Sequence, residues 1–274
     1  MRDSKDTHMS SFWEHLRSQR LTEAVNDYMF EVYGPWCIAL EHTLREGVYD
    51  PGIFKCVFMA GGPGSGKSYV ADELFGLDAG FKSSFSHYGL KVVNSDNMFE
   101  YLLKKLDVSP KELANIERTD PKQFDFLTQH PEGPRARAKV LTAKQQHIYM
   151  EGKLGMIIDG TGDDYEKMAA KKKHAEAAGY DTMMVFVHTT LDVAQERNRK
   201  RSRSLPDAMV LDIWHSCQKN RERYEHLFGR RDYVEVYNSV GGVPHQKVFQ
   251  AVNAFVKRPV QNPKGVAWMR AHGL

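Results

Sequence analysis

Two adjacent runs decide the fold: the apolar run FKCVFMA at residues 54–60 and the glycine-rich run GGPGSGKS at residues 61–68. The second run fits the spacing GxxxxGK[ST] without a mismatch, directly after a segment typical of a buried strand and directly before a helical pattern. A triphosphate needs a ring of backbone N–H donors, and glycine lets the backbone curl closely enough to provide one. The sequence therefore predicts a phosphate-binding loop between a strand and a helix.

This loop predicts binding of ATP together with Mg²⁺. We expect Lys67 to reach the β- and γ-phosphates and the Ser68 hydroxyl to bind Mg²⁺, with the dipole of the following helix adding to the attraction. A glycine turn that happens to precede a lysine is the alternative, but it does not explain the flanking strand and helix. The residues expected to bind the nucleotide are Gly61, Gly62, Pro63, Gly64, Ser65, Gly66, Lys67, Ser68 and Tyr69.

Short apolar runs alternate with helical patterns on both sides of the loop. This alternation predicts an α/β fold, with a parallel sheet covered by helices on both faces and ligands at the carboxyl ends of the strands. The expected strands are residues 54–60, 91–94, 156–159, 182–188 and 233–237. The expected helices are residues 67–77, 97–106, 136–153, 164–178, 191–200, 206–227 and 243–256.

The chain also predicts additions to this core. Residues 11–45 have helical periodicity, so we expect an N-terminal helical extension over residues 1–50. The domain that holds the phosphate-binding loop is expected over residues 51–260. Residues 107–135 hold four prolines and few aliphatic side chains, which indicates an insertion with at most short helices. A tail follows at residues 261–274.

Composition excludes few functions. The apolar fraction of 41% can fill a sizeable core, and the net charge of +3 does not by itself predict a nucleic-acid partner. The three cysteines are far apart and show no CxxC spacing, as expected for thiols in a reducing compartment. No apolar run approaches the roughly 20 residues of a membrane span. We therefore expect a cytoplasmic protein without a membrane partner.

Two aspartates follow expected strands and are the candidate acidic groups of the site. Asp96 comes just after the second strand, where it could activate an acceptor hydroxyl; the alternative is that it caps the next helix, a role that Ser95 could also take. Asp159 ends the third strand and could hold Mg²⁺ through a water molecule; the alternative is a turn residue before Gly160.

A basic run, RNRKRSR at residues 197–203, follows the fourth strand and is the candidate for a mobile lid over the phosphates. Arg197 and Arg201 are four residues apart and would share one face of a helix, where like charges repel unless an anion lies between them. A solvated helix face is the alternative. We expect Arg197 and Arg201 to act together with Lys67 and Asp96 in catalysis.

The phosphate-binding loop alone does not separate kinases from GTPases and motor ATPases. Residues 159–162 match the DxxG pattern of a GTPase, but no NKxD-type guanine motif occurs in the chain. A motor ATPase usually has a glutamate beside its strand-end aspartate, whereas Gly160 follows Asp159. An ATP-hydrolysing motor or switch stays open as an alternative, as does a nucleotide-binding toxin or regulatory module covered by its own N-terminal helices.

The order of these motifs resembles a known family. A strand with GGPGSGKS, a strand ending NSD, a strand ending IIDGTG, a helix ending ERNRKR and a strand ending VYNS are similar to the P-loop kinases that include polynucleotide kinases and zeta toxins, over about residues 54–240. The resemblance implies a five-stranded kinase core and ATP as donor. It also implies acceptor activation by Asp96, a Walker-B-like role for Asp159, lid arginines at 197 and 201, and adenine near residues 238–242.

The expected acceptor of the phosphoryl group is inferred from this resemblance and from the basic stretches of the chain. We expect a hydroxyl on a nucleic acid or nucleotide, with a hydroxymethyl-pyrimidine base in DNA as the first choice, as in a phage-type 5-hydroxymethyluracil DNA kinase. A 5′-hydroxyl polynucleotide end and a sugar nucleotide are the alternatives. The lysine run 171–173 could touch nucleic-acid phosphates, but we favour a solvated helix face there.

Overall fold

The computed structural model describes residues 52–76, 86, 88–201, 204–239 and 246–274. They form two compact units: a helical unit at Ser95–Lys144, and a sheet unit made of the described parts of Tyr49–Asn94 and Gln145–Leu274. The expected N-terminal helical extension at residues 1–50 lies outside the described residues. The helices of the described part are too short or too polar to cross a membrane.

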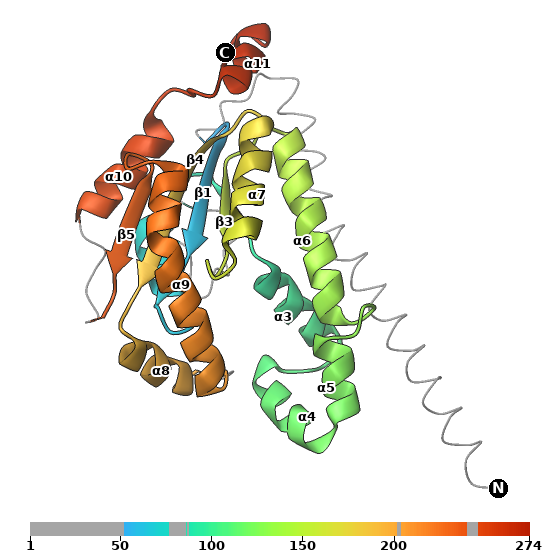
Figure 1. The fold of residues 1–274 in the computed structure, drawn as a ribbon. Helices are drawn as coiled ribbons and strands as arrows, with labels where there is room; N and C mark the ends of the chain where they lie inside the picture. Colours follow the sequence, from blue (N-terminus) through green and yellow to red (C-terminus); the bar gives the residue numbers. More distant parts are fainter. Residues whose placement is uncertain (1–51, 77–85, 87, 202–203, 240–245) are drawn as a thin grey trace, which may run out of the picture. The chain divides into compact units, whose positions relative to one another are not determined.

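The sheet unit is built on five strands that all run parallel, in the order β2-β3-β1-β4-β5 (Figure 1). This order puts β1 in the middle, with β3 on one side and β4 on the other. It confirms the predicted α/β fold with a five-stranded parallel sheet, and the expected strands agree with the observed ones to within one residue at either end. The strands are β1 Lys55–Ala60, β2 Lys91–Val93, β3 Met156–Asp159, β4 Asp181–His188 and β5 Tyr233–Tyr237.

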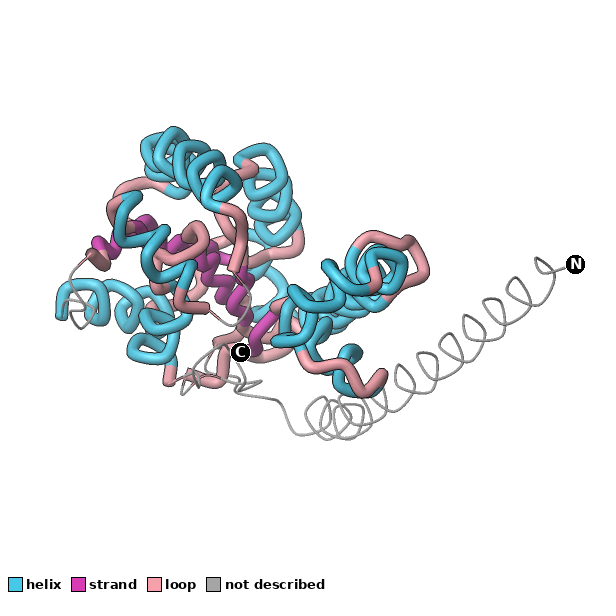
Figure 2. The backbone as a smooth tube through the Cα atoms, turned by 90° about the horizontal axis from the view of Figure 1, so that it is seen from below, coloured by secondary structure: helices cyan, strands magenta, loops and turns pink. Residues whose placement is uncertain are grey.

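Helices cover both faces of this sheet, as predicted (Figure 2). On one face, Val57 of β1 shares an apolar core with Val70 of α2 and Val252 of α10. On the other face, the ring of Phe58 meets that of Phe228 of α9 at a centroid distance of 5.4 Å. Successive residues of β1 thus pack in different layers, which explains why the whole strand is apolar. The helices of this unit are α2 Lys67–Phe75, α7 Tyr165–Ala177, α8 Leu191–Arg199, α9 Asp207–Phe228, α10 Gln246–Lys257 and α11 Pro263–Ala271.

The helical unit holds the proline-rich insertion, which forms short helices as expected. Ser109 and Glu112 make a capping box at the first of them, and the Asp120 side chain accepts a hydrogen bond from the Gln123 N–H at the start of another. Apolar side chains of this unit, among them Phe99, form a core of their own. Its elements are α3 Ser95–Lys105, η1 Pro110–Glu112, α4 Leu113–Thr119, α5 Pro121–Thr128 and α6 Pro134–Glu151, the last turns of which belong to the sheet unit.

The C-terminal tail forms a helix, α11, that the sequence did not predict. The segment before it is tied to the start of β4, because the buried Asp181 carboxylate accepts hydrogen bonds from the backbone N–H groups of Gln261 and Asn262. The same carboxylate pairs with the buried Lys55 ammonium at 2.8 Å. The buried charge pair therefore holds the tail to the sheet. No amphipathic pattern in the tail predicts this contact.

Candidate nucleotide-binding site

The glycines of the loop at residues 61–68 are required by close contacts. Gly64 and Gly66 have positive φ angles of 74° and 81°, a conformation that side chains disfavour. A Cβ atom on Gly64 would lie 2.1 Å from the Ala194 carbonyl oxygen, and one on Gly66 would lie 2.1 Å from Nδ2 of Asn238. No side chain caps the following helix α2 at Gly66. Its N-terminal N–H groups are therefore available to an anion, as a phosphate-binding loop requires.

Lys67 lies at the carboxyl ends of the central strands. Its Nζ is 2.8 Å from the Asp159 carboxylate and donates a hydrogen bond of 2.6 Å to the Gly160 carbonyl oxygen. Asn94, which follows β2, donates from Nδ2 to the other oxygen of Asp159 at 3.2 Å. Both side chains of the Lys67–Asp159 pair are largely buried. The ends of β1, β2 and β3 thus meet around one lysine–aspartate pair, where an incoming triphosphate can compete for the cation.

Asn238 joins the phosphate-binding loop to helix α8. The side-chain Nδ2 of Asn238 donates to the backbone carbonyl oxygen of Ser65 at 3.0 Å. The backbone carbonyl oxygen of Asn238 accepts a 2.7 Å hydrogen bond from Arg197 Nη1. The same Nη1 atom lies 3.3 Å from the position that a Cβ on Gly66 would take. Arg197 is therefore beside the phosphate-binding loop, as the lid interpretation expects.

Two buried polar atoms of the loop region find no hydrogen-bond partner among the described residues: Ser65 Oγ and Asn238 Oδ1. Both residues are at least 95% buried. Unsatisfied buried polar atoms are rare because each costs free energy, and they are common where a ligand or water completes the site. This pair, together with the glycine cradle, fits a bound nucleotide.

Ser68 and Asp159 are the residues that would hold Mg²⁺. Ser68 lies in the first turn of α2, and Asp159, which ends β3, pairs with the neighbouring Lys67. Within the described residues, no group of three or more histidine, cysteine or acidic side chains could hold a metal ion. This donor set fits an ion that takes its other ligands from phosphates and water, which is how Mg²⁺ is bound beside nucleotides.

Helix α9 holds the loop that follows β3. Cys217, Asn220 and Tyr224 lie on one face of the helix, and each donates to a carbonyl oxygen of that loop. Asn220 Nδ2 donates to the carbonyl oxygens of both Gly162 and Asp163. Burial raises the pKa of the Cys217 thiol to about 12, and burial also raises the pKa of Tyr224. Both side chains therefore keep the protons that these hydrogen bonds use.

Asp96 lies near the start of the described helical unit. It lies in the first turn of α3, which begins at Ser95, so Asp96 does not occupy the N-cap position that was the alternative to a functional role. Its carboxylate pairs with Arg135 at the start of α6, with 2.6 Å between Oδ1 and Nη1. The Asp96 side chain is 56% exposed. Acceptor activation by Asp96 stays a prediction.

The basic run after β4 is arranged differently from the sequence interpretation. Helix α8 ends at Arg199, so Arg201 lies beyond the helix and does not share a helical face with Arg197. The buried Asn198 side chain exchanges two hydrogen bonds with the backbone of Leu205 and so joins the two sides of the run. Arg199 pairs with Asp207. Of the two predicted lid arginines, Arg197 is next to the loop, and the catalytic role of both stays a prediction.

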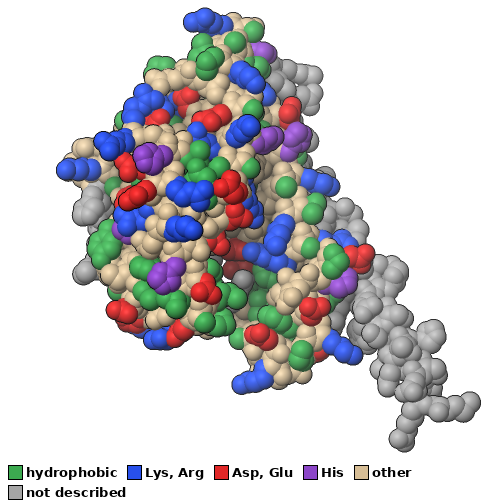
Figure 3. Space-filling model, viewed as in Figure 1, with side chains coloured by type: hydrophobic (Ala, Val, Ile, Leu, Met, Phe, Trp, Pro, Cys, Tyr) green, Lys and Arg blue, Asp and Glu red, His purple; other side chains and the backbone are tan. Residues whose placement is uncertain are grey.

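The other basic stretches are mostly satisfied within the chain. Lys172 is buried, packs on the Phe228 ring and pairs with Glu176, and burial lowers the pKa of Lys171. The favoured interpretation of this run as a solvated face is therefore wrong for these two lysines; Lys173 alone is exposed. Over α7 and α9, Lys and Arg side chains alternate with Asp and Glu side chains (Figure 3).

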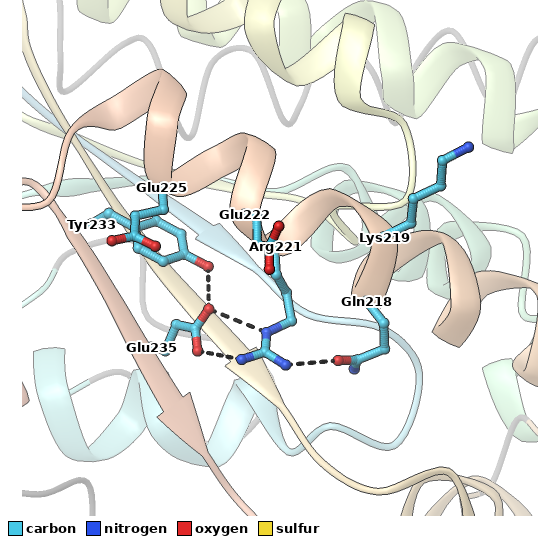
Figure 4. A pocket seen from close by; sticks show the side chains of 7 residues that line it. All are labelled: Gln218, Lys219, Arg221, Glu222, Glu225, Tyr233 and Glu235. Carbon is cyan, nitrogen blue, oxygen red and sulfur yellow. Dashed lines mark hydrogen bonds and ion pairs between the residues drawn. The ribbon is translucent and has the colours of Figure 1, made fainter.

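A surface pocket of about 660 Å³ lies between α9 and β5. Its centre is the Glu235 carboxylate, which accepts two hydrogen bonds from Arg221 and one from Tyr233 (Figure 4). Burial alone would raise the pKa of Glu235, but these donors hold it below its usual value. The central charges of the pocket, Arg221 and Glu235, are thus paired with each other, and none of its lining residues belongs to the phosphate-binding loop. The lining residues are Gln218, Lys219, Arg221, Glu222, Glu225, Tyr233 and Glu235.

The sequence interpretation missed several residues that shape the site. Asn94, Asn220 and Tyr224 were given no role, and Asn238 was included only in a segment expected near adenine. Asparagines at strand ends carry a weak signal, since the same residue type is common in turns. Asn220 and Tyr224 fall within the helix expected at residues 206–227, but a helical pattern does not disclose the hydrogen bonds that their side chains donate.

The sheet order and the phosphate-binding loop define the class: this is a P-loop NTPase fold, which binds nucleotides. A family model described as an AAA domain matches residues 56–224, more than half of the chain. The chain therefore belongs to that family of P-loop domains.

Other comparisons add little. No curated protein matches the chain. Among solved structures, a "putative kinase" from Chloroflexus aurantiacus J-10-fl is similar, with a TM-score of 0.45 and 13% identity, over 74% of this chain and 98% of that one. At this level the likeness does not identify an activity.

Proposed function

We propose that this protein is a kinase that transfers the γ-phosphate of ATP to a hydroxyl group on a nucleic acid or nucleotide-type acceptor. The observation that supports it most is the position of Arg197, whose guanidinium lies beside Gly66 of the phosphate-binding loop. Phosphoryl transfer needs cations around the transferring group, because negative charge spreads over its oxygens. An arginine that the same chain brings to this loop suits such a reaction.

Different residues act on the phosphates of ATP and on the acceptor hydroxyl. When a triphosphate binds, Lys67 exchanges Asp159 for the β- and γ-phosphates, and Arg197 exchanges the Asn238 carbonyl for the γ-phosphate. The acceptor oxygen forms a bond to the γ-phosphorus while the bond to the β–γ bridging oxygen breaks, and ADP leaves. Asp96 accepts the proton of the acceptor hydroxyl. Ser68 and Asp159 would hold Mg²⁺, which when bound neutralises charge on the phosphates.

The first-choice acceptor is a hydroxymethyl group on a pyrimidine base in DNA, followed by a 5′-hydroxyl end and then a sugar nucleotide. Support comes from the order of motifs and from the basic run after β4. The other basic stretches do not strengthen it, because their charges are largely paired within the chain. A base inside a duplex would have to be flipped out, at a cost of a few kcal/mol.

The test offers labelled ATP to four acceptors: DNA with 5-hydroxymethyluracil, plain DNA with free 5′-hydroxyl ends, free nucleosides and a uridine-diphosphate sugar. We expect label in DNA, and transfer that weakens steeply with salt because phosphate contacts release counterions. Lys67→Ala should abolish transfer, since loss of a preorganised cation costs on the order of 10² or more in rate. Label only in the sugar nucleotide would contradict the DNA acceptor, and ADP release with no labelled product would identify a motor or switch instead.

A further inference from the structure

The side chain of Arg135 is the strongest unexplained feature of the helical unit. Its Nη1 binds the Asp96 carboxylate at 2.6 Å, and its guanidinium lies 5.2 Å from the centre of the Phe99 ring. Phe99 is buried and follows Asp96 by three residues on α3, so the same helix provides both contacts. A guanidinium held between a carboxylate and an aromatic ring has lost much of its freedom before any ligand arrives.

The ion pair itself adds little to stability. The Asp96 side chain is 56% exposed and that of Arg135 is 23% exposed. An ion pair so open to water contributes little to folding, because solvent screens it and both side chains must be held still. A function in binding accounts for it better.

Arg135 has further N–H donors that could bind a ligand. Arginine has five N–H donors in a planar fork, and in the described part of the chain only Nη1 is used, by Asp96. The edge formed by Nη2 and Nε matches two oxygens of a phosphate group. Arg135 could therefore bind an anion while it still holds Asp96. The start of α6, where Arg135 lies, also favours an anion through the helix dipole.

We propose that Arg135 recognises a phosphate group on the acceptor, beside the hydroxyl that Asp96 activates. This rests on the proposed function and names its substrate class more closely. One guanidinium that touches both Asp96 and the phosphate keeps the reacting hydroxyl within a few bonds of that phosphate. The acceptor is then a nucleotide or a nucleotide unit of a nucleic acid, and neutral nucleosides and sugars are poor acceptors.

The test measures binding without transfer. A nucleoside and its 3′- and 5′-monophosphates are titrated calorimetrically into the full chain, with ADP and Mg²⁺ at saturation to fill the phosphate-binding loop. The variants are Arg135→Gln and a matched control, Lys139→Gln, which removes an exposed charge from the same helix. We expect at least one monophosphate to bind more tightly than the nucleoside. Arg135→Gln should weaken that monophosphate about tenfold or more, the usual effect of losing a charged hydrogen bond, and leave the nucleoside unchanged.

Lys139→Gln should keep the preference, and Arg135→Lys should restore part of it. Equal binding of nucleoside and monophosphates to the wild type, or a preference that survives Arg135→Gln, would overturn the proposal. The thermal unfolding midpoint of each variant shows whether a loss is merely structural. Because this measurement needs no transfer, it can fail while labelled ATP still marks DNA, and it can succeed while no acceptor is labelled. The two proposals are therefore tested separately.

Discussion

Asp96 gives the sharpest test at the scale of single residues. Asp96→Asn keeps the size of the side chain and its capacity to accept a hydrogen bond from Arg135, but an amide cannot take a proton from a hydroxyl. We expect the affinity for ATP to stay nearly unchanged and the rate of transfer to fall about 10²–10⁴-fold, the usual contribution of a general base. Equilibrium ATP binding and single-turnover transfer measure the two quantities. An Asn variant with most of its activity would reduce Asp96 to a partner of Arg135.

Asn238 gives a second test at this scale. Asn238→Ala removes the hydrogen bond to the Ser65 carbonyl oxygen, which is buried in the phosphate-binding loop, and an unsatisfied buried group costs about 1–3 kcal/mol. We expect weaker ATP binding by about tenfold or more, since the loop is no longer held in its binding conformation. Asn238→Asp should bind ATP more weakly still, because it adds a negative charge beside the triphosphate. Equal affinities of the wild type and both variants, measured by titration with a fluorescent ATP analogue, would exclude this role.

Some residues of the site could be predicted from the sequence, and others could not. Lys67, Ser68 and Asp159 were predicted because a continuous motif and a strand end specify them. Asn238 and Arg135 could not be assigned, because their partners lie 173 and 39 residues away along the chain. Such contacts depend on which strands are neighbours and on where helices begin. A single sequence states neither.

At the scale of elements, α9 acts as the support of the loop after β3. Three donors at positions 217, 220 and 224 point to that loop from one face of the helix, a spacing that the helical repeat requires. The helical pattern over residues 206–227 predicted the bounds of this helix to within one residue. It could not predict the hydrogen bonds, since an asparagine or tyrosine on a buried face looks the same whether it serves the core or a functional loop.

Asn220→Ala tests this support. The variant leaves the carbonyl oxygen of Asp163 without the Asn220 donor and that of Gly162 with Tyr224 alone, so we expect the free energy of unfolding to fall by about 1–3 kcal/mol. The rate of transfer should fall as well, because the same loop begins at Asp159. Urea unfolding and the transfer assay measure the two effects. Lys219→Ala, at an exposed neighbouring position, is the control and should change neither; equal behaviour of the two variants would deny α9 this role.

At the scale of the whole molecule, the C-terminal segment is part of the sheet unit and not an appendage. Asp181 connects β1, β4 and the segment before α11 through Lys55 and two backbone N–H groups. Asp181→Ala leaves the Lys55 ammonium buried without its partner, and breaking a buried pair in this way costs about 3–5 kcal/mol. We expect a large drop in the free energy of unfolding and faster proteolysis of residues 259–274. Glu117→Ala, an exposed acidic position in α4, should be neutral, and an equally stable Asp181 variant would show that the pair is dispensable.

The two described cysteines determine how this protein can be handled chemically. Cys56 and Cys217 are both buried, and burial raises the pKa of each thiol, for Cys217 to about 12. The thiolate is the form that reagents attack, so at pH 8 only a very small fraction of Cys217 is reactive even before access is considered. Because the pKa of Cys217 is raised, its alkylation should become faster as the pH rises towards 12. At neutral pH alkylation should stay negligible unless the protein unfolds. Mass spectrometry after iodoacetamide treatment of the folded chain should therefore find both thiols unmodified, and dye labels for distance measurements can be attached to cysteines introduced on the surface once Cys37, the third cysteine, has been replaced.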